Sequence, residues 1–273
     1  MLFIKSKVGL VKFTGGTIML SKLSEEDFSV LRGSFESGRQ SPNSFGGILI
    51  LSVFLQGLMF FLVYVVAADR SIYPYKEIMF SIHLGITIIL VLLSVIYAIP
   101  SVYMKHQRMQ YFLSIVVSQN LFGLFSYIMP LFFLGKVRDI TKDSLLTFTV
   151  ITLLFGLLFF IATLIRFFVL LRKGEYRTGS KRDELRSKVE KKSYFPIAVV
   201  GGTGLVFVIQ YLIRTVNFDI ETTFMVILGI VLFYAMLFVL PEQLVILYCK
   251  HRFESFNYDQ KGNLKPLGTR KGA

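Results

Sequence analysis

Six apolar runs, each long enough to cross a lipid bilayer, constrain this 273-residue chain more than any motif in it. A transmembrane helix needs roughly 20 mostly apolar residues, and within the hydrocarbon only helices and closed barrels satisfy their own backbone hydrogen bonds. The sequence therefore predicts an all-α, polytopic integral membrane protein. Its six transmembrane helices are expected to form a bundle over residues 46–67, 79–99, 111–134, 145–171, 195–213 and 224–249.

The composition agrees with these runs. The chain is 54% hydrophobic with a mean hydropathy of +0.64, which is more apolar surface than one soluble core of this length would hide. The lipid bilayer is the expected solvent. The one cysteine, Cys249, excludes an intrachain disulfide and follows the last predicted helix.

The distribution of basic residues predicts the orientation of the bundle. When alternate connections are placed on opposite sides, most of the 30 Lys and Arg residues fall on the side that holds both termini. By the positive-inside rule, the N and C termini are expected to be cytoplasmic. The basic residues behind the net charge of +13 direct membrane insertion and attract anionic lipid headgroups, so we expect no nucleic-acid partner. The predicted location is the cell (plasma) membrane.

The chain divides into a cytoplasmic N-terminal tail, 1–45, the transmembrane domain, 46–249, and a basic cytoplasmic tail, 250–273. The loops on the outer side have about ten residues each, too few to build a receptor domain. The long inner loop, 172–194, is rich in Lys and Arg. We expect it to extend the fourth helix as a charged, solvated rod.

The N-terminal tail carries two signals. Gly15 and Gly16 precede Met19, and a Gly-Gly pair is what a bacterial ribosome-binding sequence encodes when read in frame. We therefore expect translation to begin at Met19 in a bacterial gene, with residues 1–18 an untranslated leader.

Beyond Met19, residues 24–27 resemble a helix capping box, Ser-Glu-Glu-Asp. Phe28, Leu31 and Phe35 follow at helical spacing. This pattern predicts a short amphipathic helix on the inner membrane surface.

No motif for catalysis, metal binding or phosphate binding is present in the chain: HExxH, GxSxG and GxxxxGK[ST] are all missing. His83, His106 and His251 lie in different segments, so their sequence positions predict no shared metal site. We expect no catalytic residues, no cofactor and no enzymatic activity.

Polar residues from several predicted helices fall at one depth, in the inner half of the membrane. Charged side chains in the hydrocarbon cost at least about 2.5 kcal/mol each, so they usually face the bundle interior and pair. We expect Arg166 to pair with Glu242, although Arg166 is also near enough to the interface to snorkel to water. The candidate intramembrane polar layer consists of Arg166, Glu242, Gln119, Asn120 and Gln56.

Two features predict irregular or close helix packing. Pro241 removes a backbone hydrogen bond, so we expect the last helix to break there, with Glu242 at the break and residues 244–249 along the inner surface. Gly201, Gly202 and Gly204 lie inside the predicted fifth helix and favour close approach of a neighbouring helix.

Two classes of function fit this pattern. In the first, the chain is a non-enzymatic membrane protein that acts through contact with a membrane partner, as an accessory or immunity-type component, or as a homo-oligomer. In the second, it is a transporter or ABC-type permease subunit with a polar pathway in the inner half of the bundle. The outer half offers few residues to continue such a pathway, namely His83, Thr147, Thr149 and Tyr127.

Overall fold

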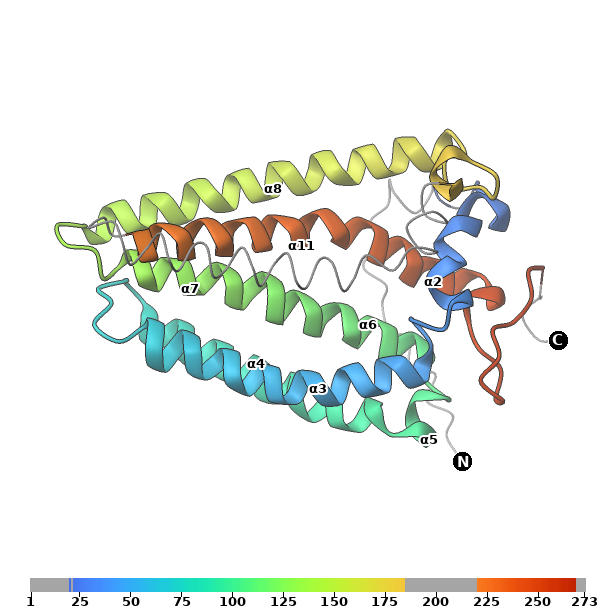
Figure 1. Cartoon of the computed structure of the whole chain (residues 1–273), viewed down its shortest axis with the longest axis horizontal. Coiled ribbons are helices and arrows are strands. Elements are labelled where there is room, and N and C mark those ends of the chain that lie inside the picture. The colour runs from blue at the N-terminus through green and yellow to red at the C-terminus, as the bar shows by residue number, and fades with distance from the viewer. Residues whose placement is uncertain (1–19, 21, 185–219, 269–273) are drawn as a thin grey trace, which may run out of the picture.

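The computed structural model describes residues 20, 22–184 and 220–268, and within these it is all α, with no sheet (Figure 1). Five helices within the described residues are long and apolar enough to cross a membrane, so the chain is a multi-pass helical membrane protein that contacts the lipid bilayer. The predicted span at 195–213 lies outside the described residues. The five spans are Pro42–Ala67, Lys76–Ala98, Gln107–Leu134, Lys142–Arg172 and Thr222–Arg252.

The helices lie side by side along one long axis in Figure 1. Residues 22–41, 99–106, 173–184 and 253–268 lie at one end, which we call the basic end, and residues 68–75 and 135–141 lie at the opposite, loop end. In chain order the elements are η1 (Glu25–Arg32), α2 (Gly33–Glu36), α3 (Pro42–Phe61), η2 (Leu62–Ala67), α4 (Lys76–Ala98), α5 (Pro100–Tyr103), α6 (Gln107–Ser118), η3 (Gln119–Leu124), α7 (Phe125–Leu134), α8 (Lys142–Arg172), α11 (Ile220–Arg252) and η4 (Glu254–Phe256).

The spans begin about one turn before the apolar runs, and at α3 and α8 this first turn starts at a polar cap that hydropathy does not detect. Ser41 caps α3, where its side chain accepts a hydrogen bond from the backbone N–H of Ser44, and Pro42 occupies the first turn. Thr141 caps α8 in the same way. At these two helices, capping chemistry therefore extends the helix beyond the apolar run.

Two spans change from α-helix to π-helix before they end. The first does so in η2 at the loop end, and the third does so in η3 near its middle. Wider turns of this kind make up well under 1% of residues in proteins and are frequent at functional sites. A π-helical turn rotates the residues that follow it relative to a regular helix. It therefore changes the directions in which several polar side chains point.

Close packing between α7 and α11 depends on one glycine. A Cβ atom added at Gly229 would collide with the Ser126 carbonyl oxygen and with the ring of Pro130, whose Cδ would lie 2.9 Å away. The kink-forming proline of α7 thus fits against the bare backbone of α11. Small residues commonly allow this close approach between membrane helices.

The break expected at Pro241 is not present, because α11 runs continuously to Arg252. In membrane helices a proline is tolerated when packing and neighbouring groups compensate for the lost backbone hydrogen bond. Val245, Ile246 and Cys249 are buried after Pro241, in the cluster that also holds Tyr111. This packing holds the last turns in line with the bundle.

The predicted amphipathic segment forms, with Ser24 and Asp27 in the expected capping box, but it is a 3-10 helix and is packed on protein. Phe28, Leu31 and Phe35 are almost fully buried. The Phe35 ring lies 6.0 Å from the Tyr111 ring, and other aromatic contacts join this segment to Phe253 and Phe256. The apolar face therefore closes the basic end of the bundle.

The basic loop does not extend α8. The chain turns at Gly174, where φ is +73°, and folds back so that Tyr176 is buried with its ring 5.0 Å from that of Phe167. The backbone N–H of Val30 donates to the Tyr176 carbonyl oxygen at 2.9 Å, which joins this loop to η1. Residues 185–194 lie outside the described part of the chain.

An ion pair across this junction makes the basic end sensitive to acid. Burial raises the pKa of Asp27, but Arg177, whose Nη2 is 2.6 Å from Asp27 Oδ1, and hydrogen bonds from Ser24 lower it further, so the net pKa is below the usual value. A lowered pKa stabilises the fold above the unfolded value of about 4, and the effect is lost as the pH falls through the folded value.

We therefore expect Asp27→Asn to lower the thermal unfolding midpoint of the detergent-solubilised protein at about pH 7 and to have a smaller effect at about pH 3. The measurement is the difference in midpoint between wild type and variant across this range. A difference that is equally large at both ends would contradict the role of the ionised Asp27.

Candidate functional site

A row of buried polar side chains follows the contact between α3 and α4. Positions 83, 87 and 94 share one face of α4, because positions 87 and 94 lie about one and about three helical turns after position 83. Polar residues of α3, η2 and η3 meet this face. We call the whole row the polar seam; it consists of Ser52, Gln56, Tyr64, His83, Thr87, Ser94 and Asn120, all buried.

His83 links three helices at the centre of the seam. Its Nδ1 atom is 3.0 Å from the hydroxyl oxygen of Tyr64, and its Nε2 atom is 2.9 Å from Oδ1 of Asn120. The Asn120 Nδ2 atom donates onward to Gln56 Oε1 at 3.5 Å. A chain of four side chains therefore crosses between η2, α4, η3 and α3.

The contacts accommodate both charge states of the His83 ring. In the neutral ring, Nε2–H donates to Asn120 Oδ1, and Nδ1 accepts from the Tyr64 hydroxyl. In the protonated ring, Nδ1–H donates to the Tyr64 oxygen, whose own proton turns to the Met79 carbonyl oxygen, 3.3 Å away. A proton can thus be added at Nδ1 with no donor left unpaired around the ring.

The π-helices position two of these partners. Tyr64 lies within η2 and Asn120 lies within η3, so both His83 contacts come from wider-than-normal helical turns. The ring of Phe125, just after η3, packs on the His83 ring with centroids 4.3 Å apart. The imidazole is therefore held by polar groups in its plane and by an aromatic ring on one face.

Two atoms of the seam have no hydrogen-bond partner within the described part of the chain: Gln56 Nε2 and Thr87 Oγ1. Gln56 is fully buried and Thr87 is 5% exposed. An unpaired polar group at membrane depth costs several kcal/mol, so such groups are uncommon unless they serve a purpose. They offer further donor and acceptor positions beside the His83 chain.

The seam approaches a charged cavity at the loop end. A cavity of about 340 Å³ is lined by Tyr64, Asp69, Arg70, Lys76 and Glu77, among others. Tyr64 therefore contributes both to this cavity and to the buried chain of hydrogen bonds.

The seam also has polar groups toward the basic end. Ser52 and Ser94 donate to carbonyl oxygens of their own helices, at Leu49 and Leu90, both at 2.7 Å. Nearer the basic end, buried Gln110 donates to the carbonyl oxygens of Pro42 and Tyr97. Polar atoms therefore occur at successive depths along the α3–α4 contact.

The predicted polar layer divides into separate groups. Gln56 and Asn120 belong to the seam, whereas the adjacent Gln119 points to α11, where its Nε2 atom donates to the Met236 carbonyl oxygen at 3.2 Å and to Gln243 Oε1 at 3.4 Å. Gly201, Gly202 and Gly204 lie outside the described residues.

Arg166 and Glu242 lie together but do not form the expected ion pair with each other. Both line a cavity of about 330 Å³ between α8, α11 and the loop after α8. The Arg166 guanidinium lies over the Phe238 ring, with Cζ 5.8 Å from the centroid. Phe238 lies one turn before Glu242 in α11, so the guanidinium is placed over an aromatic ring instead of on that carboxylate.

The outer-half candidates separate in the same way. The Tyr127 hydroxyl is 2.8 Å from Thr152 Oγ1 and donates to the Thr149 carbonyl oxygen, while Thr149 Oγ1 contacts the Tyr73 hydroxyl. Thr147 is exposed. Of the candidates for an outer pathway, His83 lies on the seam, whereas Tyr127 and Thr149 join a hydroxyl cluster between α7 and α8.

Comparison with protein-family models, curated proteins and solved structures finds no match to this chain. Function is therefore inferred from the site alone. Ser52, Tyr64, Thr87 and Ser94 are the seam residues outside the candidate set predicted from the sequence. The spacing of residues 83, 87 and 94 in a largely apolar helix is the signal that would have revealed Thr87 and Ser94.

Proposed function

We propose that this multi-pass membrane protein is a non-enzymatic transporter or permease component in which protons cross the bundle along the polar seam, with His83 taking up and releasing them. The observation that carries the proposal is the pair of contacts at His83, 3.0 Å to Tyr64 and 2.9 Å to Asn120. These contacts suit both protonation states of the ring. Ionisable residues that face the interior of a membrane bundle commonly mark proton or ion pathways.

The chemistry of the seam favours a proton over a larger solute. The side chains along it are hydroxyls, amides and one imidazole, and they are packed between helices in contact. Such groups transfer protons by exchanging hydrogen bonds, which needs no wide passage. The cavity beside Tyr64 would serve as the entrance at the loop end, where the carboxylates of Asp69 and Glu77 are balanced by two basic side chains.

The test is proton flux in liposomes that contain the purified protein and a pH-sensitive dye. With a potassium gradient and valinomycin setting an inside-negative potential, we expect proton entry well above that of empty liposomes. Flux equal to that of empty liposomes would overturn the proposal. A stable partner recovered with the protein from its native membrane would then favour the accessory or immunity-type role.

We also propose that the basic end faces the cytoplasm of a bacterial cell, with both termini on that side. Described Lys and Arg residues gather at this end, and basic residues next to membrane helices are retained on the cytoplasmic side. The loop end would then face outward.

Cysteine labelling of intact cells tests this orientation. In a Cys249→Ser background, Arg138→Cys at the loop end should react with a membrane-impermeant maleimide, whereas Lys261→Cys at the basic end should react only after lysis. The opposite pattern would reverse the orientation. Cys249 is fully buried in the cluster at the basic end. Replacing it with serine, which is slightly smaller, leaves the introduced cysteine as the single thiol that the maleimide can label.

A further inference from the structure

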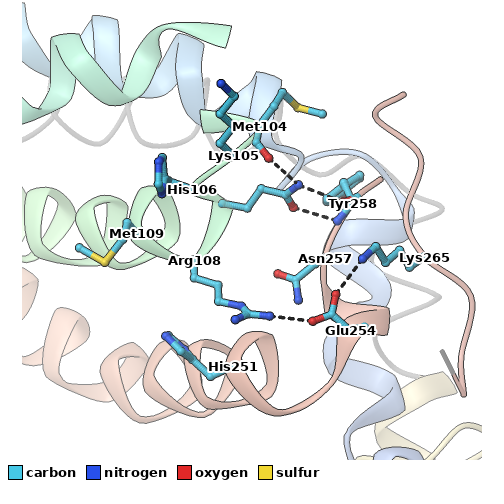
Figure 2. A pocket seen from close by; sticks show the side chains of 11 residues that line it. Met104, Lys105, His106, Arg108, Met109, His251, Glu254, Asn257, Tyr258 and Lys265 are labelled. Atoms are coloured by element: carbon cyan, nitrogen blue, oxygen red, sulfur yellow. Dashed lines mark hydrogen bonds and ion pairs between the residues drawn. The ribbon is translucent and has the colours of Figure 1, made fainter. Parts of the chain in front are cut away.

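A second polar site lies at the basic end, away from the seam. Its cavity, of about 480 Å³, lies between the start of α6, the end of α11 and the segment that follows it (Figure 2). The cavity is lined by Lys105, Arg108 and Lys265, with the carboxylate of Glu254 among them. Three permanent cations against one carboxylate leave it positively charged.

Arg108 and Lys265 both bind Glu254, and each keeps N–H donors for a further partner. Arg108 Nη2 and Lys265 Nζ each lie 2.7 Å from a different oxygen of Glu254. A guanidinium has five N–H groups and an ammonium has three, so each cation keeps donors beyond this contact. Lys105 also lines the cavity but is exposed, and its side chain points away from Arg108 and Lys265 in Figure 2. This arrangement suits an anion that accepts several hydrogen bonds, as a phosphate group does.

A buried acceptor atom on Asn257 places a second requirement on the ligand. Asn257 is 6% exposed, and its Nδ2 atom donates to the carbonyl oxygens of Lys250 and Phe253 at 2.9 and 3.2 Å, which determines the orientation of the amide. Its Oδ1 atom has no partner within the described residues, and Figure 2 shows it directed into the cavity. This oxygen needs a donor, such as a hydroxyl group, from whatever occupies the cavity.

His251 extends the same pattern. Its Nδ1 atom is 2.8 Å from the Leu247 carbonyl oxygen, so Nδ1 carries a proton. The Nε2 atom therefore accepts from a hydroxyl when the ring is neutral and donates to an anion when it is protonated. Together, the residues of the cavity present several donors, one orphaned acceptor and one ring nitrogen of either kind.

The walls of the cavity are held in position. Gln107 pairs with the backbone of Tyr258 in both directions, at 2.9 and 2.8 Å, and the Tyr258 hydroxyl donates to the Phe35 carbonyl oxygen at 2.8 Å. Arg32 donates to the Lys265 carbonyl oxygen at 3.1 Å. Preorganised polar groups reduce the cost of ordering a site when a ligand binds.

We propose that this cavity binds a phosphate group that carries a hydroxyl-bearing substituent, with Arg108 and Lys265 on the phosphate and Asn257 Oδ1 on the hydroxyl. The inference is independent of proton transfer along the seam. This chemistry is found both in a phosphoglycerol lipid headgroup and in a soluble phosphorylated polyol, and the cavity lies where α6 begins and α11 ends.

The test uses the purified full-length chain with two probes. In the lipid arm, native mass spectrometry measures binding of phosphatidylglycerol and of phosphatidylmethanol, which has the same charge but no hydroxyl. We expect phosphatidylglycerol to bind about 5-fold more tightly, the effect of one hydrogen bond to a buried acceptor. In the soluble arm, calorimetry measures binding of glycerol 3-phosphate.

Charge variants distinguish binding in this cavity from nonspecific electrostatic attraction to the basic end. Arg108→Gln and Lys265→Gln should each weaken binding about 5-fold, whereas Lys261→Gln, the same charge loss at the same end but outside the cavity, should leave it unchanged. Binding in the lipid arm alone would identify a headgroup, and binding in the soluble arm would identify a free phosphate compound. No binding in either arm, or equal weakening by all three variants, would overturn the proposal.

Discussion

Replacement of His83 by glutamine is expected to reduce potential-driven proton flux in proteoliposomes about 100-fold, a typical effect of removing one positioned proton-transfer group. Glutamine can keep a hydrogen bond to Asn120, but its amide does not gain or lose a proton at physiological pH. Flux is measured at matched protein content, with dye response as the readout.

The folding control for this variant is its thermal unfolding midpoint, which should change much less than it does for His83→Leu. Leucine would leave Asn120 Oδ1, now 2.9 Å from His83 Nε2, without this donor. Wild-type flux in a well-folded His83→Gln protein would mean that the proton does not pass through this imidazole.

The second large effect is expected at Gly229. Gly229→Ala should destabilise the protein by about 3 kcal/mol, at the upper end of the range for overpacking, because the new methyl group meets a backbone carbonyl oxygen at Ser126 and the ring of Pro130. Neither group can rotate away as a flexible side chain can. We expect a lower thermal unfolding midpoint and a lower yield of monodisperse protein.

Gly85→Ala is the matched control, because no atom lies within 4 Å of a Cβ built at Gly85 in α4. Alanine favours a helix over glycine by about 1 kcal/mol, so this change should be neutral or stabilising. Similar losses in both variants would mean that close contact between α7 and α11 is not what Gly229 provides.

Hydropathy predicted the described spans well, because the thickness of the hydrocarbon sets the length of an apolar run without reference to tertiary structure. The helix starts needed another signal: the caps Ser41 and Thr141 lie outside the apolar runs. The break at Pro241 was wrong, because a local rule about proline ignores the packing that holds the following turns in line.

The candidate site was harder to predict, because depth in a membrane is encoded by position along the chain but direction around a helix is not. Gln119 and Asn120 are neighbours at one depth, yet one contacts α11 and the other joins His83 and Gln56. The π-helix that contains both residues alters the helical phase, and no hydrophobic pattern signals it.

At the basic end, the burial of a charged residue could not be predicted from the sequence either. Lys250 is the first residue of the predicted basic cytoplasmic tail, but it is 2% exposed. Its Nζ donates to the Phe256 carbonyl oxygen at 2.8 Å and lies 4.7 Å from the centroid of the Phe35 ring. Residues more than 200 positions apart form this environment, so periodicity along the chain carries no information about it.

The most direct test of the seam compares Tyr64→Phe with Tyr127→Phe in the proton flux assay. Both tyrosines are buried in spans and both hydroxyls are hydrogen-bonded, so the chemical change is the same. Only Tyr64 contacts His83. We expect a flux at least about 10-fold lower for Tyr64→Phe and wild-type flux for Tyr127→Phe. Equal flux in the two variants would contradict a proton path through the Tyr64–His83–Asn120 chain.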